Sequence, residues 1–420
     1  MSEMMSHNAE KVDTTEKPAR RAFLKSTGLT AVGAFVGMNI PFKDNLMAMA
    51  QGMDVPDIMA GKDGLILLND RPVNAETPAH LLDDDVTPYE HFFVRNNGLV
   101  PDTALDMNAE GWTLTIDGEV ETPLELTLED LKEKFEVITR RLVVECGGNG
   151  RAFYTPGASG NQWTTGAVGC ADWTGVRLGD VLKAAGVKDS AVYTGHYGND
   201  LHLSGDEEKQ AISRGVPIEK AMAEGGMIAW EMNGKPIPAV HGFPLRLLNP
   251  GYPGSTSQKY LTRIWVRDQV HDGAKMGGYS YRLPAYPVAP GTEVPEEDME
   301  IMTEMPVKSL ITFPQTGTQT PAGEASEVRG HAWAGSGDIA SVDLSIDFGQ
   351  TWIPAKLDPP KNKFAWQRFR ADVTLPEAGY YEVWARATDM NGVAQPPVSP
   401  GWNPRGYGNN IQHRIALIAT

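Results

Sequence analysis

A strand, a glycine loop and a thiol meet in the run Val143-Val144-Glu145-Cys146-Gly147-Gly148-Asn149-Gly150-Arg151. Two β-branched residues and an acid predict the end of a strand, and the glycines after them predict a tight loop. Cys146 would then lie at the mouth of a strand, where Arg151 and loop N–H groups stabilise a thiolate. A thiolate in such a place serves as a nucleophile, a redox thiol or a ligand for a soft metal. The alternative is a buried cysteine that only fills space.

The length and texture of the chain predict two domains. A chain of 420 residues is too long for one hydrophobic core, and 44 glycines with 30 prolines indicate many loops and short strands. Short strands and helices mix between residues 112 and 268: 112–118 alternates like a strand, 127–131 opens a helix at a Thr cap, and 176–182 starts another helix. Residues 51–85 form a loop-rich lead-in, and residues 269–305 form a linker belt.

The texture changes from Val307 onward. Residues 342–347 and 379–389 alternate between apolar and polar side chains, with a turn at Phe348-Gly349. Regularly spaced short strands predict an antiparallel sandwich of immunoglobulin type, although the paired cysteines of antibody domains are missing. We therefore expect an α+β domain over residues 51–305, followed by an all-β immunoglobulin-like domain over residues 306–420.

Residues 1–50 have the pattern of a twin-arginine export signal. Arg20-Arg21 is followed by a short apolar stretch, Gly28 to Ile40, and by the cleavage pattern Ala48-Met49-Ala50. The apolar stretch is too short to span a bilayer, and no later segment resembles a membrane span. Because this route exports folded proteins, it predicts a periplasmic protein with a bound cofactor.

The net charge of residues 51–420 indicates which macromolecules this protein can bind. Residues 51–420 carry 31 Lys and Arg against 49 Asp and Glu, a net charge of −18. Nucleic-acid binding is not expected, because neutralising the phosphates needs a basic surface. A basic protein partner suits this surface better. No Cys-x-x-Cys-His motif occurs, so no c-type haem is expected on this chain.

Four other stretches combine cations, aromatics and glycines. They are residues 92–98, residues 163–176, residues 241–246 with 249–254 and 259–260, and residues 401–406. Each alone has an ordinary explanation in packing or solvation. Together with Cys146 they supply a thiolate, several guanidiniums and a lysine. These groups suit a soft metal on an anionic organic cofactor, with an anionic substrate.

These motifs resemble the sulfite oxidase family of molybdenum enzymes. The resemblance rests on Cys-Gly-Gly-Asn-x-Arg at 146–151, on Trp-x-x-Gly-Ala-Val-Gly from Trp163, on His-Gly-Phe-Pro-Leu-Arg at 241–246, and on Trp-Asn-x-Arg-Gly from Trp402. It covers about residues 90–420 in order. It implies a molybdopterin domain followed by an immunoglobulin-like domain, often used for dimerisation.

The resemblance also implies roles for single residues. Cys146 would be the thiolate ligand of molybdenum in a molybdenum–molybdopterin cofactor. Residues expected at the substrate are Arg95, Arg151, Trp163, Tyr281 and Arg405, with Tyr279 as a rival to Tyr281. Residues expected at the pterin and its phosphate are Asn96, His241, Arg246 and Lys259. Asn97 departs from a histidine common in the family, and a pterin-contacting aspartate has no clear match, with His196 and Asp200 nearby.

The expected activity is oxidation of sulfite to sulfate, with electrons passed one at a time to a separate c-type cytochrome. No cytochrome b5-type domain precedes the molybdenum domain, so no haem is expected on this chain. We also expect a homodimer and no disulfide between Cys146 and Cys170. The alternatives are a reductive relative acting on sulfoxides, a subunit of a thiosulfate-oxidation pathway, and an exported binding protein without activity.

Overall fold

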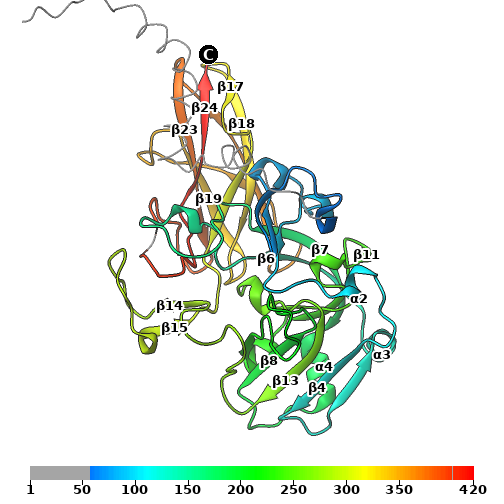
Figure 1. The fold of residues 1–420 in the computed structure, drawn as a ribbon. Helices are drawn as coiled ribbons and strands as arrows, with labels where there is room; N and C mark the ends of the chain where they lie inside the picture. Colours follow the sequence, from blue (N-terminus) through cyan, green and yellow to red (C-terminus); the bar gives the residue numbers. More distant parts are fainter. Residues whose placement is uncertain (1–56, 400) are drawn as a thin grey trace, which may run out of the picture.

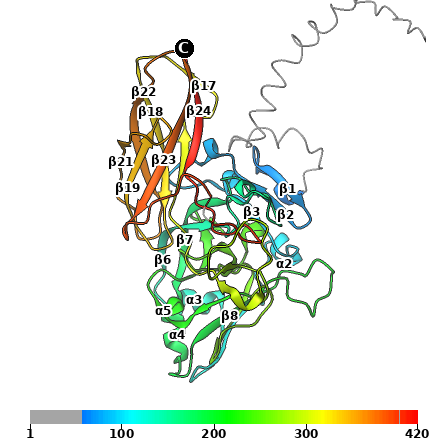
Figure 2. The same cartoon turned by 90° about the vertical axis from the view of Figure 1, so that its left-hand side faces the viewer.

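The computed structural model describes residues 57–399 and 401–420, and the predicted export signal lies outside them. A β-rich body contains about the first two thirds of these residues, and a two-sheet sandwich extends from one end of it (Figures 1 and 2). The helices are short: α2 (Asp102–Leu105), α3 (Leu128–Lys134), α4 (Leu178–Ala185) and α5 (Ile218–Met222). Within the described residues, no helix combines the length and the apolar character needed to cross a bilayer.

Two five-stranded sheets form most of the body. The first sheet has the strand order β11-β10-β7-β6, and β12 also pairs with β10. Its strands are β6 (Ile138–Glu145), β7 (Val168–Arg177), β10 (Met227–Met232), β11 (Lys235–Pro236) and β12 (Arg246–Leu248). The second has the order β5-β4-β13-β8-β9; the bounds are β4 Thr113–Gly118, β5 Leu124–Thr127, β8 Tyr193–Gly198, β9 Gly215–Pro217 and β13 Leu261–Arg267. The pair β13–β4 is parallel.

A hydrophobic core joins the second sheet to the helices. Ile116 of β4 and Ile264 of β13 share one buried cluster with Leu131 of α3 and Val181 of α4. Fully burying such an aliphatic side chain contributes about 1.5–3 kcal/mol each. This core packs the helices against the second sheet.

Two smaller sheets complete the body. The lead-in pairs β1 (Ile66–Asp70) with β2 (Val73–Glu76), and β2 with β3 (Val94–Arg95). The belt after β13 forms the hairpin β14 (Arg282–Pro284) and β15 (Met299–Ile301), which projects from the body (Figure 1). Both segments are more ordered than their composition predicts, because their strands pair: β1 with β2 in a local hairpin, and β2 with β3 and β14 with β15 across about 20 residues.

The sandwich uses the rest of the chain. One sheet has the order β16-β18-β22-β21; the bounds are β16 Lys308–Phe313, β18 Ala325–Trp333, β21 Lys356–Leu357 and β22 Gln367–Thr374. The other has the order β17-β24-β23-β19-β20; the bounds are β17 Thr318–Thr320, β19 Ile339–Ser345, β20 Ile353–Pro354, β23 Gly379–Asp389 and β24 His413–Ala419. Val328 and Phe369 of one sheet and Val342 and Val383 of the other share one buried core.

Most of the strands and helices predicted from local patterns are confirmed, but the start of one helix is wrong. Strand β6 ends at Glu145, directly before Cys146. Helix α3 begins after Thr127, whose side chain accepts from the Asp130 backbone in a capping box. The helix predicted from Val176 begins only at Leu178, because Val176 pairs with Ile228 in the ladder between β7 and β10. The inter-strand hydrogen bonds outweigh the local helical pattern there.

Candidate active site

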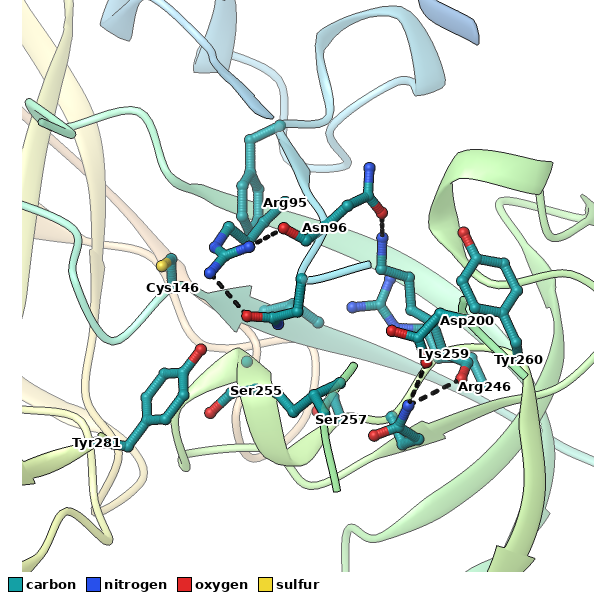
Figure 3. A pocket seen from close by; sticks show the side chains of 16 residues that line it. Arg95, Asn96, Cys146, Asp200, Arg246, Ser255, Ser257, Lys259, Tyr260 and Tyr281 are labelled. Carbon is teal, nitrogen blue, oxygen red and sulfur yellow. Dashed lines mark hydrogen bonds between the residues drawn. The ribbon is translucent and has the colours of Figure 1, made fainter. Parts of the chain in front are cut away.

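Cys146 lies where two cavities meet. The first, here the lysine cavity, is lined by Cys146 together with Arg246, Lys259 and Tyr260. The second, here the arginine cavity, has a volume of about 250 Å³ and is lined by Cys146 together with Arg95, Arg151 and Arg405. Arg95, Asn97, Cys146 and Tyr281 line both cavities. Figure 3 shows Cys146, Arg95 and Tyr281 at one end of the lysine cavity and Arg246, Lys259 and Tyr260 at the other.

The loop that carries Cys146 is fixed by the strand before it and by the sandwich. The Cys146 backbone N–H donates to the Ala167 carbonyl at 2.9 Å, and the Asn149 N–H donates to the Cys146 carbonyl at 2.9 Å. Glu145 is buried and accepts from Lys308 Nζ of β16 at 2.5 Å and from Trp333 Nε1 of β18 at 2.8 Å. The thiol position therefore depends on side chains from both domains.

The two cysteines have different surroundings. Cys146 is 7% exposed and faces the cavities, whereas Cys170 is fully buried in β7 and faces Val143 across the ladder. Both thiols are free. Burial raises the pKa of the Cys170 thiol to about 12. Only Cys146 therefore has access to a ligand, while Cys170 acts as a small apolar side chain.

Arg151 needs the glycines around it. A Cβ on Gly148 would lie 2.3 Å from Arg151 Nη2, and one on Gly406 would lie 2.7 Å from Arg151 Cγ. Both glycines thus give the buried arginine its space, which explains their places in the two motifs. Arg151 Nε donates to the Arg405 carbonyl at 2.6 Å, so this side chain also holds the loop of Arg405.

Arg95 and Arg405 reach the arginine cavity from segments near opposite ends of the described chain. Arg95, at the end of β3, donates from Nη2 to Asn97 Oδ1 at 2.9 Å. Arg405 is exposed and donates to Ser159 Oγ at 2.8 Å. The structure thus brings together all three predicted arginines, and Asn97 orients one of them.

The structure distinguishes the two candidate tyrosines. Tyr281 lines both cavities, and its hydroxyl points toward the space beside Cys146 and Arg95 (Figure 3). Its ring stacks on Tyr407 with centroids 5.1 Å apart. Tyr279 instead donates its hydroxyl to the Val294 carbonyl at 2.6 Å. Tyr281, and not Tyr279, therefore lies at the cavities, and its role at the substrate stays a prediction.

The lysine cavity gathers buried cations. Lys259 Nζ donates to Asn96 Oδ1 and, at 2.7 Å, to the Val240 carbonyl. Burial lowers the pKa of Lys259 well below its usual value, and the charge of Arg246 adds to this shift. Burial also lowers the pKa of Arg246 to about 10. A bound anion would reverse both shifts, because an opposite charge favours the protonated forms.

Unsatisfied polar atoms line the same cavity. In the described part of the chain, Arg246 Nε, Ser255 Oγ, Gln258 Oε1 and Tyr260 Oη are buried without a hydrogen-bond partner. Buried polar groups are normally paired, so these atoms indicate a polar ligand between them. A phosphate-bearing heterocycle with a soft metal near Cys146 fits this donor set.

Asp200 rather than His196 lies at the lysine cavity. Asp200 lines it and accepts from Gln258 Nε2 at 3.3 Å, and burial raises the pKa of Asp200 to about 6. His196 is fully buried and bonded to Thr194 Oγ1 at 2.8 Å. The geometry therefore favours Asp200 over His196 as the counterpart of the pterin-contacting aspartate of the family.

Two predicted residues lie behind the cavity walls. Trp163 is fully buried in the apolar cluster that contains Cys146 and packs edge-on against Phe93. His241 is buried between Tyr89 and Phe92, and its carbonyl accepts from Arg246 Nη1 at 3.0 Å. Neither lines the two cavities as described here, so direct contacts from them remain predictions.

Sequence reasoning assigned no individual role to several cavity residues, although Tyr260 lies in one of the four stretches. They are Ser255, Gln258, Tyr260, Lys275 and Tyr407. Tyr260, Lys275 and Tyr281 have positive φ angles of 52°, 73° and 52°. Such angles are rare for these residue types and cluster at functional sites. They arise from tertiary packing, so no sequence pattern reveals them.

Comparisons with known proteins agree with this geometry. The family model described as oxidoreductase molybdopterin binding domain matches residues 98–275, and the Mo-co oxidoreductase dimerisation domain matches residues 299–420. The chain is 34% identical to mitochondrial sulfite oxidase of Macaca fascicularis, over 83% of this chain and 64% of that protein. It is 31% identical to sulfite oxidase of Gallus gallus, over 86% of this chain and 80% of that protein.

A solved structure is similar as well. The sulfane dehydrogenase SoxCD from Paracoccus pantotrophus aligns with a TM-score of 0.68 and 27% identity, over 87% of this chain and 91% of that one. The fold and the site define an oxidoreductase that holds a molybdenum–pterin cofactor. The chain belongs to the sulfite oxidase family of molybdenum enzymes.

Proposed function

We propose that this protein oxidises sulfite to sulfate. The observation that carries the proposal is the arginine cavity, in which three guanidiniums face a space that reaches the thiol of Cys146. Sulfite and water would yield sulfate, two protons and two electrons. When bound, the molybdenum cofactor supplies oxygen-atom transfer and accepts the two electrons.

The residues of this chain would bind and orient the reactants. Cys146 would hold the metal by its thiolate, and Arg246, Lys259 and Asn96 would hold the pterin and its phosphate. Arg95, Arg151 and Arg405 would neutralise the oxyanion, because charge-assisted contacts position it and offset the acidic charge of the whole chain. Tyr281 would donate a hydrogen bond to an oxygen atom beside Cys146.

We also propose a cellular location, an electron acceptor and an oligomeric state for this protein. The twin-arginine pattern in residues 1–50 supports export to the periplasm, and the acidic charge supports transfer of single electrons to a basic c-type cytochrome. The dimerisation-domain match supports a homodimer formed through the sandwich, which we assign to the immunoglobulin-like class. Replacing Arg20-Arg21 with Lys-Lys and fractionating the cells tests export, and light scattering tests the dimer.

A single preparation tests the activity. The protein is purified from a host with a twin-arginine pathway, molybdenum and pterin are measured, and sulfite-dependent ferricyanide reduction is followed with sulfate formation. We expect close to one molybdenum per chain and stoichiometric sulfate. A protein without molybdenum would instead support the binding-protein alternative.

Oxidation of a sulfane sulfur is a second candidate. The likeness to SoxCD, which is described as a sulfane dehydrogenase, favours it over the reductive alternative on sulfoxides. Comparing kcat/KM for sulfite, for a persulfide and for a sulfoxide under reducing conditions separates the three. A persulfide value far above that for sulfite would replace the first proposal with the second.

A further inference from the structure

The arginine cavity contains a fourth cation. Lys275 lines its wall with Arg95, Arg151 and Arg405, although it lies in the belt between β13 and β14. In the part of the chain described here, no hydrogen bond or ion pair engages its ammonium group. Partial burial lowers the pKa of Lys275, and the charges of Arg95 and Arg405 lower it further. The ammonium group of Lys275 is therefore close enough to both arginines to be repelled by their charges.

A buried arginine lies beneath this lysine. Arg214 is fully buried and donates from Nη1 to the Lys275 carbonyl at 2.9 Å. Its guanidinium carbon lies 4.6 Å from the centre of the Tyr281 ring. Among the described residues, its Nε and Nη2 atoms have no hydrogen-bond partner. Arg214 thus contacts two cavity residues, Lys275 and Tyr281, whose backbones are both left-handed.

Among the described residues that line the arginine cavity, no carboxylate balances these charges. Apart from the four cations, its lining residues in the described chain are neutral side chains and the thiol of Cys146. Like charges held together without a counter-ion repel each other, and a bound anion removes that repulsion. A doubly charged oxyanion would offset more of the repulsion than a singly charged one.

We propose that Lys275 is a specificity-determining cation of this anion site, that the site selects a divalent oxyanion, and that Arg214 positions Lys275. The proposal deepens the function proposed above and rests on it for the choice of sulfite as substrate. The anion site itself rests on the geometry.

Loss of Lys275 has two effects of opposite sign. In the free protein, Lys275→Gln removes repulsion, so thermal stability stays the same or rises. With an anion present, the same change removes a charge-assisted contact and weakens binding by about 10-fold. A lysine with a purely structural role would instead lower the stability of the free protein.

To test this, sulfate is titrated into the purified holoenzyme and the thermal unfolding temperature is measured. Chloride at matched ionic strength is the reference. A ligand that binds only the folded state raises the transition temperature in a saturable way. We expect Lys275→Gln to need about 10-fold more sulfate for the same rise, and Lys275→Arg to restore the response. Lys209→Gln is the matched control, because exposed Lys209 pairs with Asp206 and lines neither cavity. A lower starting temperature with an unchanged sulfate response in Lys275→Gln would overturn the proposal.

Arg214 is tested by a double-mutant cycle. If Arg214 acts on the anion through Lys275, Arg214→Gln weakens the sulfate response alone but adds nothing in the Lys275→Gln protein. Fully additive losses would refute the positioning role. Sulfate affinity is the readout here, because the contact of Arg214 with Tyr281 also affects turnover.

Kinetics separate this inference from the proposed function. In a sulfite-oxidising enzyme, Lys275→Gln should raise KM for sulfite about 10-fold and leave kcat within about 2-fold. Without sulfite turnover, a sulfate response that depends on Lys275 would uphold the anion site and refute only the proposed function. Sulfite turnover with wild-type KM and sulfate response in Lys275→Gln would refute only this inference.

Discussion

The chemistry at the residue scale depends on where each side chain is placed, as the two cysteines illustrate. Cys146 borders both cavities, whereas Cys170 is enclosed by apolar side chains such as Leu82 and Trp366. The residue type alone therefore does not tell which cysteine faces a ligand and which only fills space in the core.

Replacing Cys146 with serine should abolish sulfite oxidation and leave a folded protein. The serine oxygen is a harder and poorer ligand for molybdenum than a thiolate, and the volume change is small. Steady-state sulfite assays with circular dichroism measure both effects. Cys170→Ser is the control and should keep its activity, with a cost in stability from a buried hydroxyl. Full turnover in Cys146→Ser would show that Cys146 is not the ligand.

The three arginines should differ in how they respond to replacement by glutamine. Each loss should raise KM for sulfite by the equivalent of about 1.5–3 kcal/mol, the worth of a charge-assisted contact. Arg151→Gln should also lower thermal stability, because Arg151 is buried and holds the Arg405 carbonyl. Arg405 is exposed, so Arg405→Gln should affect kinetics alone. Unchanged KM in all three variants would move the substrate site elsewhere.

At the scale of elements, β6 and β16 are joined by a buried ion pair. Lys308 Nζ lies 2.5 Å from Glu145 Oε1, with the two side chains 8% and 2% exposed. Lys308 also donates to the Asn149 carbonyl at 3.1 Å, within the loop of Cys146. The sandwich thus stabilises the strand end that presents the thiol.

Lys308→Met should destabilise the fold by about 3–5 kcal/mol, because it leaves the Glu145 carboxylate buried without its cation. The double variant Glu145→Gln/Lys308→Met should be less destabilised, since no unpaired charge remains. Chemical denaturation measures the free energies, and metal analysis should find less bound molybdenum in the single variant. A double variant that is less stable than Lys308→Met would argue against this account.

At the scale of the whole molecule, the acidic surface should steer the electron acceptor. Residues 51–420 have a net charge of −18, to which Glu296, Glu297 and Asp298 between β14 and β15 contribute. Transient electron-transfer pairs bind through small, charge-complementary faces. A basic c-type cytochrome fits such a face.

The rate with the cognate cytochrome should fall as ionic strength rises at saturating sulfite. The Debye length shrinks from about 30 Å at 0.01 M to about 10 Å at 0.1 M, which screens the attraction. Stopped-flow reduction of the cytochrome measures the rate. Ferricyanide, a small anion, is the control, and its rate should not fall in the same way. A flat or rising cytochrome rate would indicate an apolar docking face.

Local patterns in the sequence determined much of the architecture. Alternation predicted β4 and β23, a threonine cap predicted α3, and the glycine loop after β6 predicted the position of the thiol. These features depend on a few neighbouring residues, so they can be recognised without the fold. The motifs likewise predicted the kinds of group at the site: a thiolate, guanidiniums and a lysine.

Only the tertiary structure decided which of these groups meet. Arg151 and Arg405 are 254 positions apart and share a hydrogen bond, and Lys275 joins them from a belt that looks like a linker. The choice of Tyr281 over Tyr279 depends on a positive φ at Tyr281 and on stacking against Tyr407. Such contacts form when distant strands pair and their cores pack, and that packing also outweighs local propensity, as at the late start of α4. A sequence encodes local geometry residue by residue, whereas a site of convergent charges exists only once the chain has folded around it.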